Sequence, residues 1–198
     1  MYRTSELRFS EAAADIPEMT SDKRHRLANE KRVEIGSRIE MLQTLTGHKW
    51  VGEASHTTAT KQPLGPNAEQ KIAISLLDDL GLAHCFDSIE RGGKYYSWVQ
   101  FAINHVMLDI FMDSETTFSV LEEGAVYGYP ISSSLAFAGI IPAKKAKQKS
   151  VANYYLSGVN SEKYYDRETK YTDMVWRHLC EIAPGLTTEA YEEYMKRN

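Results

Sequence analysis

The sequence has little of what marks a secreted, membrane-bound or metal-binding protein. Its two cysteines, Cys85 and Cys180, form no Cys-x-x-Cys pair, so we expect a reduced protein with two buried thiols. The longest apolar run, Leu135 to Ile141, is far shorter than the about 20 residues of a membrane span. The N-terminus has no apolar segment typical of a signal peptide. We therefore expect a cytoplasmic protein outside the membrane.

Catalytic and cofactor motifs are also missing. None of the 6 histidines belongs to a His-x-x-x-His or His-Glu-x-x-His pattern, so zinc would need ligands from distant parts of the chain. The chain has no Gly-x-Ser-x-Gly elbow and no glycine-rich phosphate loop. We expect no metal and no cofactor.

A strong positive charge, typical of nucleic-acid-binding proteins, is missing too. The net charge is −4 and the isoelectric point is about 5.9. A basic run followed by Tyr154-Tyr155 has the residue types that bind phosphates and stack on bases, but a solvated helix face explains it more simply. The run consists of Lys144, Lys145, Lys147 and Lys149. We expect no nucleic-acid binding.

The composition is that of a soluble globular protein, with 42% hydrophobic and 25% charged residues in a chain of 198. This length suits one domain with a short extension. Residues 1–19 are polar and contain Pro17, which predicts a flexible leader. Residues 20–198 are predicted to form a single α+β domain.

Apolar residues at helical spacing predict one long helix from the Thr20-Ser21-Asp22 caps to Gly47. Residues 48–66 have no period and predict a long loop. A second helix begins at the capping box of Asn67 and Gln70 and ends at Gly81. Further helices are predicted from Ser114 to Glu123 and over 130–138, 143–157, 162–182 and 188–197.

The middle of the chain has a sequence pattern typical of β-strands. Leu82 to Glu90 and Tyr95 to Ile103 flank the turn Arg91-Gly92-Gly93-Lys94, which predicts a hairpin. Val106 to Met112 is predicted as a third strand. The fold class is therefore α+β, with a small, mostly antiparallel sheet of about three strands in residues 82–112, packed by N- and C-terminal helices.

The segment from Leu121 to Gly139 contains the most residues that shape turns and helix ends. Gly124 is predicted to end a helix with positive φ, Gly128 to make a second bend, and Pro130 to begin a new helix. Serine hydroxyls at that helix start have the chemistry to bind a small anionic ligand, but we favour the simpler interpretation, a well-capped helix hairpin. The predicted ligand-binding residues are Tyr127, Gly128, Tyr129, Ser132, Ser133 and Ser134.

The run from Gly128 to Phe137, Gly-Tyr-Pro-Ile-Ser-Ser-Ser-Leu-Ala-Phe, resembles the signature of an uncharacterised prokaryotic family, domain of unknown function 483 and its relatives. The resemblance covers residues 67–182 and includes the paired Tyr154-Tyr155. Ser132 and Ser133 stand where the family often has cysteines, so no metal or thiol role is transferred. The resemblance implies a similar order of elements and no particular activity.

Two other groups of residues have both a chemical and a structural interpretation. Cys85 beside His84 is better explained as a core thiol than as a nucleophile, because neighbours in a strand point to opposite faces. Carboxylates that would converge on a metal or do acid–base work are Asp109, Asp113, Glu122 and Glu123. Local roles at helix ends explain these too, and we favour those roles.

Tyrosine is concentrated near the C-terminus, where Trp176 also lies. The tyrosines are Tyr154, Tyr155, Tyr164, Tyr165, Tyr171, Tyr191 and Tyr194. Because tyrosine is enriched in interfaces, we expect a homodimer formed through the C-terminal helices; packing within the chain is the alternative. The sequence thus favours a cytosolic binding or interaction protein. The alternatives are a small hydrolase or transferase with its site near the Gly-Tyr-Pro turn, and a nucleic-acid accessory protein.

Overall fold

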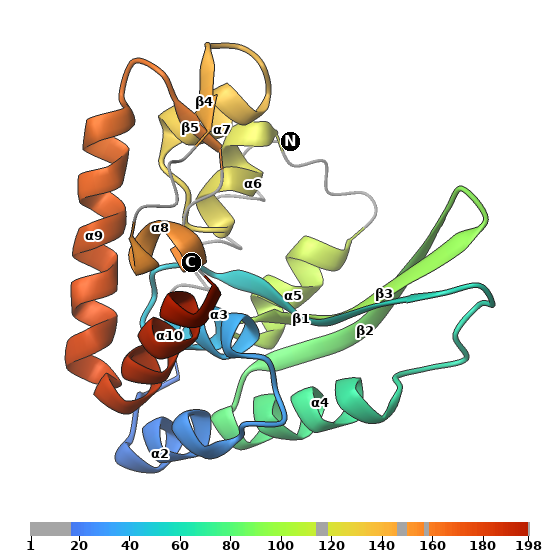
Figure 1. Ribbon diagram of the computed structural model, residues 1–198. Helices are drawn as coiled ribbons and strands as arrows, with labels where there is room; N and C mark the ends of the chain where they lie inside the picture. The colour runs from blue at the N-terminus through green and yellow to red at the C-terminus, as the bar shows by residue number, and fades with distance from the viewer. Residues whose placement is uncertain (1–16, 114–118, 146–149, 157–158, 198) are drawn as a thin grey trace. The chain divides into compact units, whose positions relative to one another are not determined.

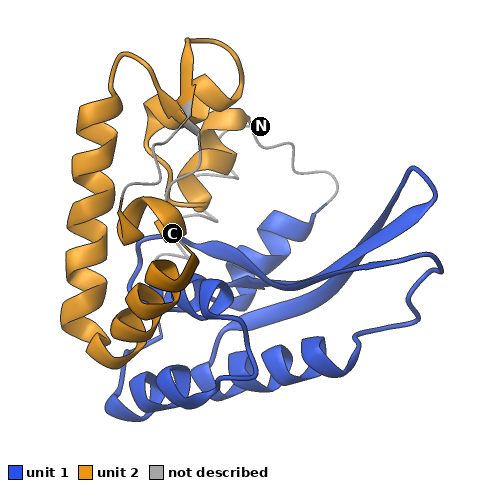
Figure 2. Ribbon diagram, viewed as in Figure 1, with its two compact units in different colours: residues 1–116 blue, residues 117–198 orange. Residues whose placement is uncertain are grey.

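A computed structural model describes residues 17–113, 119–145, 150–156 and 159–197. The chain divides into two compact units, residues 1–116 and 117–198, coloured separately in Figure 2. About 55% of the residues are helical and 18% are in strands, which confirms the α+β class. The predicted leader lies almost entirely outside the described residues.

Unit 1 contains a three-stranded antiparallel sheet with the order β1-β3-β2. The strands are β1 (Val51–Ala59), β2 (Ala83–Arg91) and β3 (Lys94–Ala102). The predicted β2–β3 hairpin is confirmed: its turn has positive φ at Gly92 and at Gly93, 60° and 74°, as a tight hairpin turn requires. β3 is the central strand, so both other strands depend on it.

The predicted third strand is wrong. Residues 106–112 belong to helix α5 (His105–Met112), which begins where the Asn104 side chain accepts a hydrogen bond from the Met107 N–H. The third strand is instead β1, within the predicted loop 48–66. A bulge with Ser55 at φ 53° interrupts its pairing with β3, and this interruption hides the alternation of the strand.

The predicted long first helix is two helices, α2 (Ser21–Asn29) and α3 (Ile35–Leu45). Arg38, 1% exposed, explains why the break is stable. Its guanidinium donates to the carbonyl oxygens of Leu27 and Ala28, both at 3.2 Å, and of Val33 at 3.0 Å. The side chain thereby satisfies carbonyls that the end of α2 leaves without helical partners.

The core of unit 1 lies between the sheet and helices α3 and α4 (Ala68–Leu80), with α4 running along the sheet in Figure 1. The predicted Asn67–Gln70 capping box and the end of the helix at Gly81, φ 72°, are confirmed. The buried side chains are mainly large and apolar. They include Leu42, Leu76, Leu80, Val99 and Phe101.

Unit 2 is built from short elements and two longer helices. The short helices are α6 (Val120–Val126), α7 (Ile131–Phe137) and α8 (Val151–Leu156), and the strands β4 (Ala143–Lys145) and β5 (Val159–Ser161) form an antiparallel pair. The long helices are α9 (Tyr165–Ile182) and α10 (Pro184–Arg197). α7 packs on the β4–β5 pair, and α8, α9 and α10 pack on one another.

In unit 2 the sequence predicted the C-terminal helices and α7 well. The helix predicted over 143–157 is wrong in its first part, because Ala143–Lys145 is a strand paired with β5. Ser114, the predicted cap of the preceding helix, lies outside the described residues; Ser119 caps α6, in a capping box with Glu122. No helix in the described parts of the chain is long and apolar enough to cross a membrane.

Candidate functional site

The turn between α6 and α7 is shaped by Gly128, whose φ is 74°, as predicted. The Gly128 N–H donates to the Ala125 carbonyl at 3.0 Å, and the Tyr129 N–H donates to the Gly124 carbonyl at 2.8 Å. This pair of bonds is the Schellman motif, which satisfies the last carbonyls of a helix. Pro130 then stands at the N-cap of α7 with φ −56°, so the turn is tight.

Gly124 does not end a helix, and this prediction is wrong. It is buried inside α6, and its role is close contact. A Cβ at this position would lie 1.8 Å from Ser134 Oγ and 2.7 Å from Ser134 Cβ. α6 and α7 therefore touch at Gly124 and Ser134.

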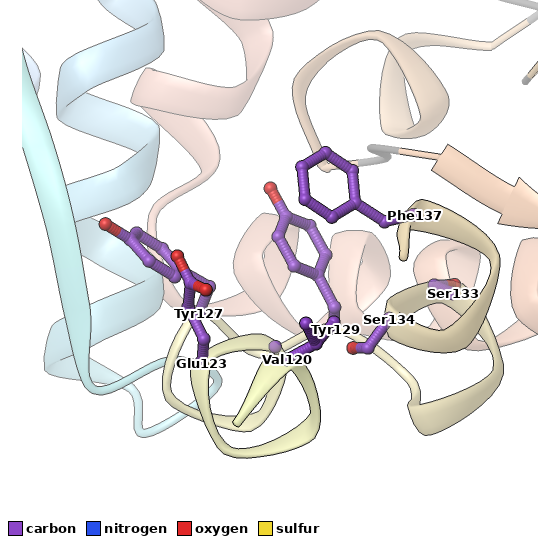
Figure 3. A pocket seen from close by; sticks show the side chains of 8 residues that line it. Val120, Glu123, Tyr127, Tyr129, Ser133, Ser134 and Phe137 are labelled. Carbon is purple, nitrogen blue, oxygen red and sulfur yellow. The ribbon is translucent and has the colours of Figure 1, made fainter. Parts of the chain in front are cut away.

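Beside this contact lies a cavity of about 360 Å³, here called the α6–α7 cavity. In Figure 3 the rings of Tyr129 and Phe137 extend toward each other from the turn and from the end of α7. Glu123 and Tyr127, one helical turn apart, lie on another side. The lining residues are Val120, Glu123, Gly124, Tyr127, Tyr129, Ser133, Ser134 and Phe137.

The structure brings together most of the predicted site residues. Tyr127, Tyr129, Ser133 and Ser134 line the α6–α7 cavity, and Gly128 makes the turn that holds them. Ser132 is elsewhere, because successive residues of a helix point about 100° apart. The sequence missed Val120, Glu123 and Phe137 as lining residues; their spacing on short helices was the available signal.

The Ser132 hydroxyl donates to the carboxylate of Glu168. That carboxylate also accepts from the Ser161 N–H at 2.8 Å and from the Ser161 hydroxyl at 2.7 Å. Glu168 is 2% exposed and Ser161 is fully buried, so the cluster connects α7, β5 and α9 in the interior of unit 2. No local pattern in the sequence marks this long-range cluster.

The electrostatics of the other candidates favour their structural interpretations. Burial, and then the charge of Asp87, raise the pKa of the Cys85 thiol, whereas a nucleophilic cysteine needs a lowered pKa. Hydrogen bonds from the side chain and the backbone of Ser119 lower the pKa of Glu122, as its capping role implies. Asp109 lies within α5 and Asp113 follows it.

A metal centre has no donor set in the described part of the chain. No three His, Cys, Asp or Glu side chains gather there closely enough to hold an ion. His84 pairs with Asp78 at 2.9 Å, and His56 lies 3.4 Å from the Glu53 carboxylate. These pairs have two members each, which is too few for a zinc site.

The predicted basic run is only partly described. Lys144 is in β4, and its ammonium lies 4.6 Å from the centre of the Tyr165 ring. Lys147 and Lys149 lie outside the described residues. The contact of Lys144 is a cation–π interaction within unit 2.

Aromatic residues of the C-terminal helices pack on each other within the chain. Tyr154 lies edge-on to Tyr155 and to Tyr194, at 4.8 Å and 5.6 Å between ring centres. Tyr155 stacks on Trp176 at 6.1 Å. This packing accounts for part of the tyrosine concentration without a second chain.

Comparison of the chain with family models, with curated proteins and with solved structures finds no match. The resemblance to the Gly-Tyr-Pro family therefore stays a prediction. The function has to be argued from the geometry of the α6–α7 cavity.

Proposed function

We propose that this protein binds small molecules with an apolar body, and that the α6–α7 cavity is its binding site. The observation that carries the proposal is the cavity itself. Its volume of about 360 Å³ lies within the range of ligand pockets, roughly 300–1,000 Å³. Apolar and aromatic walls with a few polar groups are also typical of such pockets.

The exposure of the lining supports this proposal. Phe137 is 73% exposed and Tyr129 is 41% exposed, although both line a concave site. When a ligand covers large apolar side chains that are exposed to water in a cavity, the free energy of the system falls, and this favours binding. The tight Gly128 turn and the Gly124–Ser134 contact preorganise the walls, which lowers the entropic cost of binding.

An enzyme is less well supported. The described lining includes serine hydroxyls and one carboxylate but no histidine, lysine or cysteine. The Ser134 hydroxyl, one of the two serine hydroxyls of the lining, lies 3.4 Å from the Pro130 carbonyl oxygen, which cannot take up its proton. A serine nucleophile needs an adjacent general base.

The small anionic ligand predicted from the sequence also fits the geometry poorly. The Ser132 hydroxyl already donates to the Glu168 carboxylate, so an incoming anion would meet a negative charge. In the α6–α7 cavity the charged side chain of the described lining is Glu123, which is negative as well. We therefore favour a neutral or cationic ligand.

Titration with a neutral aromatic alcohol, 2-naphthol, tests the proposal by NMR. We expect saturable shift changes at Tyr129, Ser134 and Phe137. Val120→Trp places a large ring in the cavity and should abolish them. Ile131→Trp, at an exposed position outside the lining, is the matched control. Absence of shifts in the unmodified protein, or shifts that survive Val120→Trp, would contradict the proposal.

Self-association is a second proposal, in the cytosolic compartment expected from the sequence. Its support is the exposed pair Tyr191 and Met195, 51% and 56% exposed, one turn apart on α10. Light scattering at micromolar concentration should give a dimer mass, and Tyr191→Lys with Met195→Lys should give a monomer. A monomer mass for the unmodified protein would rule the proposal out.

A further inference from the structure

Two adjacent glutamates of α6 have different surroundings. The Glu122 carboxylate accepts from the Ser119 N–H at 2.8 Å and completes the capping box. Glu123 lines the α6–α7 cavity, and its carboxylate has no hydrogen bond or ion pair with the described residues. Glu122 therefore has a role in starting the helix, whereas local structure does not explain Glu123.

Three aromatic rings share the cavity with Glu123. The ring centres of Tyr127 and Tyr129 are 6.4 Å apart, and their planes differ by 25°. A cation placed beside such a pair can lie within about 6 Å of both centres, the range in which ring faces attract cations. Phe137 adds a third ring to the lining.

We propose that the α6–α7 cavity binds an organic ammonium ion, a primary or methylated amine on an apolar body. This inference rests on the proposed function and names its ligand class. The Glu123 carboxylate neutralises the positive charge, the tyrosine faces contact the alkyl groups around the nitrogen, and Val120 and Phe137 cover the apolar body.

A metal ion does not fit this site. Calcium and magnesium take several oxygen ligands at short distances, and the described lining offers a single carboxylate. An alkylammonium needs less: one counter-charge and ring faces that replace part of its hydration shell. The mainly apolar cavity wall then favours the ammonium over a fully hydrated ion.

Two probes of nearly the same shape test the charge. Benzyltrimethylammonium is a cation, and neopentylbenzene is its neutral isostere. We expect the cation to bind the unmodified protein about tenfold more tightly than the isostere, from cation–π and ion-pair attraction together. Added salt should weaken the binding of the cation and leave the isostere unchanged. NMR shifts of the lining residues give both dissociation constants.

Substitutions at the two adjacent glutamates of α6 identify which carboxylate binds the cation. Glu123→Gln should weaken binding of the cation about two- to fivefold and leave the neutral probe unchanged. Glu122→Gln is the matched control, because glutamine also completes a capping box; it should change neither affinity.

The other outcomes show whether the ammonium inference fails alone or together with the binding function. Equal affinities for the two probes would overturn the ammonium inference and leave the binding function standing. Unchanged binding of the cation to Glu123→Gln would overturn the inference as well. If neither probe shifts the lining residues, the binding function fails together with the inference.

Discussion

The cores of the two units are built from different side chains. In unit 1 the buried residues are mainly large aliphatic and aromatic ones such as Leu42, Leu76 and Phe101. In unit 2 many buried residues are small or polar, among them Ala136, Ala152, Ser161 and Glu168. Conversely, most of the exposed large apolar side chains of the described residues lie in unit 2.

This difference indicates which of the two units a bound ligand would stabilise more. Unit 1 buries its large apolar side chains, and their burial stabilises the folded unit directly. Unit 2 contains a hydrogen-bonded cluster around the buried Glu168 carboxylate and leaves Phe137 and Tyr129 exposed at a cavity. A ligand that covers them would stabilise unit 2 by an amount that rises with the logarithm of its concentration once this exceeds the dissociation constant.

Phe101→Ala should have the largest effect on stability. The ring is fully buried in unit 1 and packs against Gly52, where a Cβ would lie 2.5 Å from the ring. We expect a loss of about 3–5 kcal/mol in the free energy of unfolding, because the change leaves a cavity. Hydrogen exchange of peptides from unit 1 measures it.

Phe137→Ala in unit 2 is the matched control for this prediction. The same atoms are removed from a ring that is 73% exposed, so the change should stay within about 0.5 kcal/mol. Similar losses at both positions would break the comparison between the units.

Glu168→Ala should cost unit 2 about 2–4 kcal/mol, because three donors, two of them buried, lose their acceptor. These donors are the hydroxyls of Ser132 and Ser161 and the Ser161 N–H. Hydrogen exchange of peptides from α7, β5 and α9 measures the loss. Glu181→Ala, at an exposed position of the same helix, should be neutral. An unchanged unit 2 would show that the polar cluster does not stabilise it.

Gly124→Ala should cost about 1–3 kcal/mol, because the new methyl group overlaps Ser134 Oγ. Ser134→Gly should remove the clash, and in that background Gly124→Ala should stabilise unit 2, since alanine is the better helix former. Denaturant titrations of the four combinations measure the coupling. Additive effects would mean that the two residues do not set the spacing of α6 and α7.

The smallest effect concerns acid. A hydrogen bond from Arg32 is the main cause that lowers the pKa of the Glu30 carboxyl to about 2, from an ordinary value of 4.5. Because the folded-state pKa is the lower one, Glu30 stabilises unit 1 above pH 4.5, and this contribution is lost as the pH falls toward 2. Glu30→Gln should flatten that part of the pH dependence.

Urea midpoints at pH 5 and at about pH 2.5 test the acid prediction. Glu34→Gln, at an exposed position that makes no side-chain cap bond, is the control and should keep the full pH dependence. If Glu30→Gln also keeps the full pH dependence, Arg32 and Arg26, which both donate to Glu30, do not hold its carboxylate in the folded state.

Features that depend on local chemistry could be predicted from the sequence. The Gly92-Gly93 hairpin, the Asn67–Gln70 capping box and the positive φ of Gly128 each need only neighbouring residues. One prediction failed although the deciding signal was local: residues 106–112 were predicted as a strand, but the Asn104 cap starts a helix there.

Features that depend on distant residues could not be predicted. The bulge at Ser55 hides β1 until β3 is known as its partner, and the break between α2 and α3 is held by Arg38 from the following helix. The pairing of Ser132 with Glu168 spans 36 positions. Gly124 seemed to be a helix end because its partner Ser134 lies on another helix.

The strand order β1-β3-β2 also determines when the sheet can form as the chain is synthesised. The β2–β3 hairpin is local and closes through Gly92-Gly93, so it can fold on the microsecond scale of hairpins. β1 precedes both strands in the chain, yet among the described strands it pairs with β3 and not with β2. It must therefore wait for its partner on the ribosome until β3 emerges, beginning with Tyr95, which pairs with Ala59. Joining β1 to the hairpin also requires closure of a long loop, which slows folding.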